Sequence, residues 1–311
     1  MAWAPARAAE IDSVTGRSAE LRDSASRLEA RVNDFLREGV KRANEREKGC
    51  DPGDLYKQIR RAISFPFIGH SIAERLNAAE DLDRRRVPLR DSIYRDLGIF
   101  DAISVHLKDL SSVVRVGDQL VGVDKFGHFF VQGWKYFEIA YLDGKGIEKA
   151  LAWGEASERT YFGLYTTGIY SHADLTANFE GMRFWLRVLG QAEDPLEKGY
   201  FFNRPYVKCG KRFWTREPHW RVKRKVRLGD FLSAGWDEGV NCSHYRNAQI
   251  ERLILARIEE REVSDGAEYS CPIRPDECAR ARKRYAAHAE RLLHPFCLFA
   301  EPEPRPWWKF W

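Results

Sequence analysis

The sequence lacks the short motifs that mark the common nucleotide-binding and hydrolytic sites. The patterns GxGxxG, GxxxxGK[ST], HExxH and GxSxG are all absent from its 311 residues. These absences argue against a standard nucleotide-binding loop, a conventional zinc protease and a conventional serine hydrolase. The sequence therefore predicts no nucleotide cofactor.

Long apolar runs are also missing, since no segment reaches the roughly 20 apolar residues of a membrane-spanning helix. Hydrophobic residues nevertheless make up 44% of the chain, which is enough for a sizeable core. The net charge of +5 is too small to indicate nucleic-acid binding. It is compatible with an anionic envelope component as partner, such as phospholipid, lipopolysaccharide or peptidoglycan.

No two cysteines have the CxxC spacing, so a zinc knuckle is not expected. An even number of cysteines predicts three disulfides in an oxidising compartment, with Cys271 and Cys278 as the expected local pair. The alternative is a set of free buried thiols in a reducing cytosol. The six cysteines are Cys50, Cys209, Cys242, Cys271, Cys278 and Cys297.

Apolar residues recur at helical spacing through most of the chain, which predicts a mainly α fold. We expect a helical bundle around three central helices, at about 121–142, 147–165 and 171–189. A long first helix is expected at 11–47. A small hairpin or irregular β insertion is expected near 205–227.

Two regions follow from this pattern. Residues 11–190 are expected to form a helical core domain, and residues 191–311 a loop-rich and helical region packed on that core as one compact unit. Residues 111–120 are expected to form a short strand pair or a loop before the first central helix.

Polar residues interrupt the apolar faces of the first two central helices. Asp124 and His128 are four residues apart, a spacing that suits two ligands of one divalent metal or a carboxylate that orients an imidazole. Glu155 and Glu158 fall within an otherwise apolar stripe, where carboxylates are costly unless they are paired, metal-bound or protonated. The alternatives are an intrahelical Asp–His hydrogen bond and a solvated pair of glutamates.

The third central helix begins with further polar residues. Ser171 is the expected N-cap, with Asp174 at the capping-box position three residues later. Asp174 and Asn178 are expected beside each other on one face, with Arg183 following and His172 able to reach the same site. The alternative is that Asp174 only caps the helix.

The run from Asp124 to Phe129, DKFGHF, resembles the DKxxHF signature of small bacterial envelope proteins, including the VanZ-like family and exported lipoproteins. The resemblance covers one or two helices. It implies an association with the bacterial envelope, and a functional group formed by Asp124, Lys125 and His128. Unlike the membrane-embedded VanZ-like proteins, this chain has no predicted membrane span.

The N-terminal residues support export. Ala6-Arg7-Ala8 resembles the small-residue end of a signal peptide, although no apolar core precedes it. We expect a periplasmic or secreted protein whose signal peptide is truncated in this sequence. The alternative is an alanine-rich cytosolic start.

Three functions are compatible with these patterns. The first is a metal-assisted hydrolase of phosphoesters or lipid head groups, in which Asp124, His128 and Glu158 hold one divalent ion (Zn, Mg or Mn). The second is an envelope glycosidase with Glu155, Glu158 and Asp174 as paired acid and base. The third is a non-catalytic scaffold whose polar cluster is structural.

Overall fold

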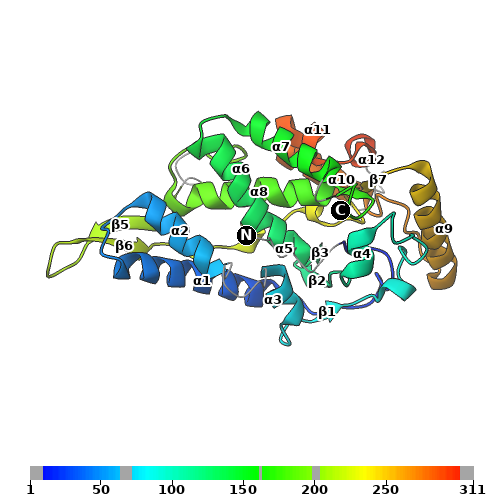
Figure 1. Ribbon diagram of the computed structural model, residues 1–311, viewed down its shortest axis with the longest axis horizontal. Coiled ribbons are helices and arrows are strands. Elements are labelled where there is room, and N and C mark those ends of the chain that lie inside the picture. Colours follow the sequence, from blue (N-terminus) through cyan, green and yellow to red (C-terminus); the bar gives the residue numbers. More distant parts are fainter. Residues whose placement is uncertain (1–9, 64–71, 161–162, 198–203, 302–311) are drawn as a thin grey trace, which may run out of the picture.

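The computed structural model describes residues 10–63, 72–160, 163–197 and 204–301 (Figure 1). The fold is mainly α with little strand, as predicted. The signal-peptide remnant expected at residues 6–8 lies outside the described residues. Within the described ranges, no helix is long and apolar enough to cross a membrane.

Seven helices have at least seven residues each among the residues described, and five are shorter. The longer helices are α1 (Ala25–Glu45), α2 (Pro52–Ile63), α3 (Ile72–Ala78), α7 (Ile147–Arg159), α8 (His172–Leu189), α9 (Ala248–Asp265) and α10 (Pro275–Tyr285). The shorter ones are α4 (Ile103–Leu107), α5 (Asp124–Gly127), α6 (Gly133–Phe137), α11 (Ala289–Leu292) and α12 (Pro295–Phe299).

The strands are short and all their pairings are antiparallel. One sheet has the order β1-β2-β3, built from β1 (Arg84–Arg85), β2 (Val113–Val116) and β3 (Gln119–Gly122). The expected hairpin is β5 (Val207–Lys211) with β6 (Pro218–Val222), and β4 (Ile169–Ser171) pairs with β7 (Ser243–Tyr245). Residues 111–120 therefore contribute to a strand pair rather than a loop.

The first helix is shorter than predicted. It begins at Ala25 instead of residue 11. Asp12 Oδ1 accepts the backbone N–H groups of Val14 and Thr15 at 2.9 and 2.8 Å, and Ile11 forms a parallel bridge with Ser111. An aspartate that accepts nearby backbone N–H groups stabilises a turn in competition with the helix.

The first central helix begins at Asp124, because the residues up to Gly122 belong to β3. From there to Leu142 the chain is helical throughout, with π-helical turns at His128–Gln132 and Glu138–Leu142 between the α-helical segments. Single π turns within α-helices are frequent at functional sites. The first of them begins at His128.

Helix α8 is the central element of the core, and every residue of it except Leu189 is buried. It crosses the 124–142 helix where Gly133 meets Gly181, since a Cβ atom on Gly133 would lie 2.6 Å from the Gly181 Cα. Two glycines at the crossing let the helix backbones touch. This close approach brings the N-terminal half of α8 beside Asp124, Lys125 and His128.

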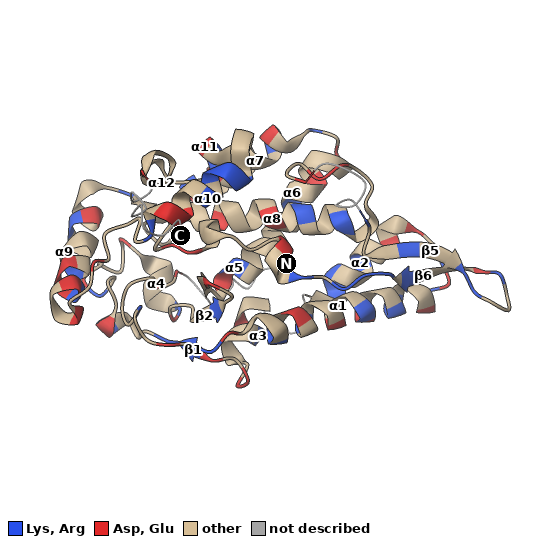
Figure 2. Ribbon diagram, turned by 180° about the vertical axis from the view of Figure 1, so that it is seen from behind, with Lys and Arg blue, Asp and Glu red and all other residues tan. Residues whose placement is uncertain are grey.

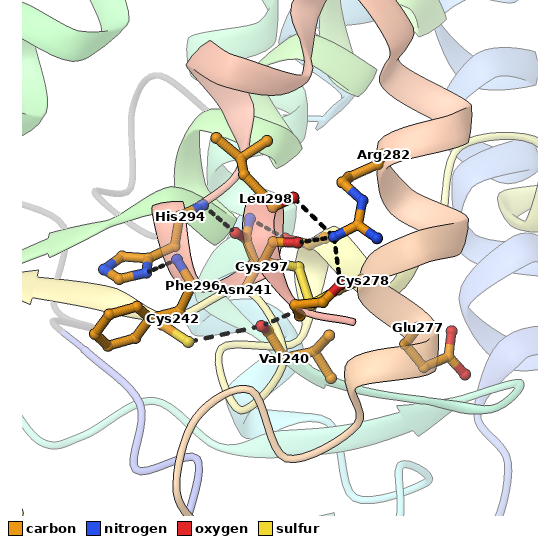
Figure 3. The surroundings of a disulfide bond; sticks show 12 residues. Val240, Asn241, Cys242, Glu277, Cys278, Arg282, His294, Phe296, Cys297 and Leu298 are labelled. Atoms are coloured by element: carbon orange, nitrogen blue, oxygen red, sulfur yellow. Dashed lines mark hydrogen bonds between the residues drawn. A yellow bond between two sulfur atoms is a disulfide. The ribbon is translucent and has the colours of Figure 1, made fainter. Parts of the chain in front are cut away.

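Three disulfides are present, as predicted, but the expected Cys271–Cys278 pair is wrong. The bonds join Cys50 to Cys209, Cys242 to Cys271 and Cys278 to Cys297. The loop after Cys271 is fixed beside Cys242, because Ile273 N donates to Gly239 O at 2.8 Å. Cys278 lies on α10, which packs against α12 and its Cys297 (Figure 3).

Candidate metal centre

A buried lysine lies at the centre of the polar cluster. Lys125 has no exposed side-chain surface, and its Nζ lies 2.6 Å from Asp124 Oδ2, 2.6 Å from Asp174 Oδ1 and 2.5 Å from Glu238 Oε1. These carboxylates come from α5, from the first turn of α8 and from the segment before β7. Three segments that are far apart in the sequence therefore converge on one ammonium group.

Two further carboxylates, Glu10 and Glu158, are buried and interact electrostatically with Lys125 and Asp174. Five acidic side chains are thus grouped around one lysine and one histidine. Asp124 Oδ1 and Glu10 Oε2 have no hydrogen-bond partner among the described residues. Buried acceptors without donors are unfavourable, so these two oxygens require a proton or a cation in addition to Lys125.

Burial changes the acidity of these groups. It raises the pKa of Glu238 to about 7, although the Lys125 charge opposes the change. Burial and neighbouring carboxylates raise the pKa values of Glu10 and Glu158 well above their ordinary range. Burial would also raise the pKa of Asp174, but the charges of His128 and Lys125 lower it below the usual value. The cluster therefore combines ionised and protonated carboxyl groups near neutral pH.

His128 joins the 124–142 helix to α8 through both of its ring nitrogens. Its Nε2 lies 3.1 Å from Asp174 Oδ2, and its Nδ1 lies 3.2 Å from Asn178 Oδ1. A neutral imidazole can donate from only one nitrogen. The Asn178 amide, whose Nδ2 has no partner among the described residues, can present either its oxygen or its nitrogen to Nδ1, and a metal ion could replace the proton on Nε2.

Asp124, His128 and Asp174 form the one group of potential metal ligands found among the described residues. One ligand atom from each lies within 4.8 Å of the others. The sequence predicted Asp124 and His128 as ligands together with Glu158, but Asp174 takes the third position in this group. Glu158 is buried beside it and interacts electrostatically with Asp174.

Glu155 does not join the cluster. It is paired with Arg291, whose Nε and Nη2 donate to its two carboxylate oxygens at 2.6 and 2.8 Å. The buried face of α7 consists of Ala150, Leu151, Gly154 and Glu158. Glu155 lies beside that face, which is why only one of the two predicted glutamates reaches the interior.

Arg183 also lies outside the cluster, further along α8, where it pairs with Glu180 and Asp194. His172 begins α8 but contacts a different group of side chains. Its ring centroid lies 5.0 Å from that of His244 and 5.3 Å from that of His294. Among the described residues, no hydrogen bond joins His172 to the Asp174 site, so its participation there stays a prediction.

These three histidines do not form a second metal centre as they are arranged. His294 Nδ1 accepts the Phe296 backbone N–H at 3.0 Å (Figure 3). A neutral His294 ring therefore has its proton on Nε2, which faces His244 Nδ1 at 3.2 Å. Burial, reinforced by the other two rings, lowers the pKa of His172 to about 2. The group is thus a set of neutral, mutually packed rings.

Two members of the cluster were not predicted as site residues, Glu10 and Glu238. Glu238 lies in the polar segment from Asp237 to His244, whose density of polar side chains was a usable signal. Glu10 has no sequence pattern around it that indicates burial. Its position depends on the pairing of its backbone with Ser111, whose N–H donates to Glu10 O at 2.9 Å.

Comparison of the chain with protein-family models, with curated proteins and with solved structures gave no significant match. The resemblance to envelope proteins with a DKxxHF helix therefore stays a prediction. The function is therefore inferred from the arrangement of the residues around Lys125.

Proposed function

We propose that this protein is a divalent-metal-dependent hydrolase whose ion is held by Asp124, His128 and Asp174. The observation that carries the proposal is the convergence of three potential ligand atoms beside three further buried carboxylates and a single lysine. A divalent cation would replace protons on these carboxyl groups and supply a partner for Asp124 Oδ1. Oxygen-rich ligands with one imidazole favour Mg²⁺ or Mn²⁺, or Zn²⁺ in a mixed site.

The residues divide into distinct roles. A bound metal ion would lower the pKa of a water molecule and orient it for attack. Glu238, whose pKa burial raises to about 7, is suited to accept or return a proton near neutral pH. Lys125 holds Asp124, Asp174 and Glu238 in place through its three contacts. Asn178 orients His128 through Nδ1.

We propose phosphoesters or lipid head groups as the substrate class, because a bound metal ion can stabilise the charge of a phosphoryl group. The glycosidase alternative is less well supported, because it needs Glu155 and Glu158 in one site. Glu158 lies on the buried face of α7, whereas Glu155 lies beside that face and is paired with Arg291. Three disulfides are typical of an extracytoplasmic protein, and we propose the bacterial periplasm as its compartment.

The first test is metal binding by protein purified without a histidine tag and treated with a chelator. Isothermal titration with Mn²⁺, Mg²⁺ and Zn²⁺ should show binding of one ion per chain to the wild type. Asp124→Asn and His128→Gln should abolish it, because each removes a ligand. Glu155→Gln is the matched control, since it removes a carboxylate from the same region of the fold but outside the ligand group, and should bind normally.

The second test is hydrolysis of a chromogenic phosphodiester by the metal-loaded wild type. Activity should be lost in Asp124→Asn and strongly reduced in Glu238→Gln, whose metal affinity should persist. Metal binding without hydrolysis would leave a metal-stabilised binding protein. The absence of binding by any of the three ions would contradict the proposal and favour the scaffold interpretation.

A further inference from the structure

The β5–β6 hairpin extends away from the body of the protein, past α1 and α2, at the end opposite α9 (Figure 1). Its turn, residues 212–217, carries the two adjacent aromatic side chains Phe213 and Trp214, which are 77% and 88% exposed. They contact each other edge to face, with ring centroids 4.8 Å apart. Two adjacent exposed aromatic side chains form a small apolar patch, and exposed apolar patches rimmed by polar residues can mark binding surfaces.

The hairpin and its flanking residues, 204–227, account for the net positive charge of the protein. Ten of residues 204–227 are Lys or Arg and one is acidic, which gives the segment a net charge of +9 against +5 for the whole chain. The remainder of the chain therefore has a net charge of −4. All ten basic residues are exposed, and several of them are visible along β5 and β6 in Figure 2.

The base of the hairpin is fixed to the helical body. The Cys50–Cys209 disulfide joins β5 to the segment between α1 and α2. The Asn44 side chain donates to Trp220 O at 3.0 Å and accepts from Trp220 N at 2.9 Å. Within the turn, Arg216 has a left-handed φ of 62° and Arg212 N donates to Glu217 O at 2.9 Å. A hairpin held in this way is already ordered before binding. It therefore loses little conformational entropy when its turn binds a partner.

We infer that this hairpin binds the surface of an anionic phospholipid bilayer, with Phe213 and Trp214 in the interfacial layer and the surrounding Lys and Arg residues against the head groups. Aromatic rings favour the membrane–water interface, and basic residues near an anionic surface each strengthen binding. The net charge of +9 on the hairpin segment favours an anionic surface over a neutral one. The net charge of −4 on the remainder of the chain would keep the hairpin oriented toward that surface. The hairpin and the metal centre share no residues, so the membrane-binding inference and the proposed hydrolase function can be tested independently.

The test is flotation of the whole protein with vesicles of phosphatidylcholine, and with vesicles of equal parts phosphatidylcholine and phosphatidylglycerol. We expect binding to the anionic vesicles and little to the neutral ones. Arg212→Gln with Arg216→Gln should weaken it by about 30-fold. Arg90→Gln with Arg252→Gln, which removes two exposed arginines elsewhere, should leave it nearly unchanged.

The aromatic pair is tested separately. Phe213→Ser with Trp214→Ser should abolish binding, whereas Phe100→Ser, at a residue that is 91% exposed elsewhere, should not. Quenching of tryptophan emission by brominated lipid should be lost in Trp214→Phe, although that variant still binds. Equal binding to neutral vesicles, no binding to either kind, or equal losses in the test and control variants would overturn the inference.

Discussion

The two halves of α8 each carry a cluster of buried charges, and the clusters differ in their balance. In the C-terminal half, Arg183 and Arg187 share Asp194, with Nε–Oδ distances of 2.8 and 2.6 Å. Arg284 approaches Glu180 at 2.9 Å, and Glu197 pairs with Arg187 at 2.6 Å. Three guanidinium groups thus face these three carboxylates, and the partly exposed Asp230 lies 3.8 Å from Arg187 as a fourth. In the N-terminal half, one ammonium group and one imidazole face five carboxylates.

The difference separates a structural network from a candidate site. Each of the carboxylates of Glu180, Asp194 and Glu197 is bridged by two arginines, one on each oxygen, so its charge and its acceptor atoms are both satisfied and the network needs no further ligand. The Lys125 cluster has acceptor atoms without donors, and more carboxyl groups than cationic groups. Natural proteins rarely bury such a surplus unless something compensates it, so this half of α8 is where we expect a metal ion to bind.

The largest effect is expected from Arg183→Met. Removing one member of the balanced network leaves buried carboxylates uncompensated, and should lower the free energy of unfolding by about 5 kcal/mol. Divalent metal should not restore it, because this network has no ligand group. Urea denaturation with and without Mn²⁺ measures both values, and recovery on adding metal would show that the two clusters are not distinct.

Lys125→Met should destabilise the protein by about 4 kcal/mol at neutral pH for the same reason. Here the loss should be partly reversed by mild acid, since protonated carboxyl groups no longer need a counter-charge. Parallel urea titrations at pH 5 and pH 7.5 measure the recovery. An equal loss at both values would mean that the surrounding carboxylates do not act as one charged group.

Glu238→Gln should change the pH dependence of stability in metal-free protein. The pKa of Glu238 is about 7 in the folded state against an ordinary value of 4.5, so folding favours its protonated form. Its contribution is complete below pH 4.5 and is lost as the pH rises through 7, by about 3 kcal/mol. The glutamine variant should lose that dependence in urea titrations between pH 4.5 and pH 8. A slope equal to that of the wild type would contradict the raised pKa.

The smallest effect is expected from Glu155→Gln. The Glu155–Arg291 pair is partly exposed, so its removal should cost at most about 1 kcal/mol and leave metal binding unchanged. Thermal unfolding is sufficient to measure the change. A loss of several kcal/mol, or of metal affinity, would place Glu155 in the site after all.

Several site residues could be predicted because their spacing lies within one helix. Asp124 and His128 share a face by their four-residue separation, and Asp174 was found through its place three residues after the N-cap Ser171, whose Oγ accepts the Asp174 N–H at 3.2 Å. Glu155 and Glu158 could not be distinguished in the same way. Both are near the apolar stripe, and only the packing of α7 decides which one is buried.

The sequence by itself determined the mainly α character, the hairpin near 205–227 and the presence of three disulfides, because these follow from local periodicity, turns and composition. Only the tertiary structure decided which cysteines pair and which carboxylates surround Lys125. Glu10, Asp174 and Glu238 come from distant segments, and their meeting depends on how helix faces and backbone pairings fit together. Helical spacing shows which residues share a face, whereas packing between distant segments decides which faces meet.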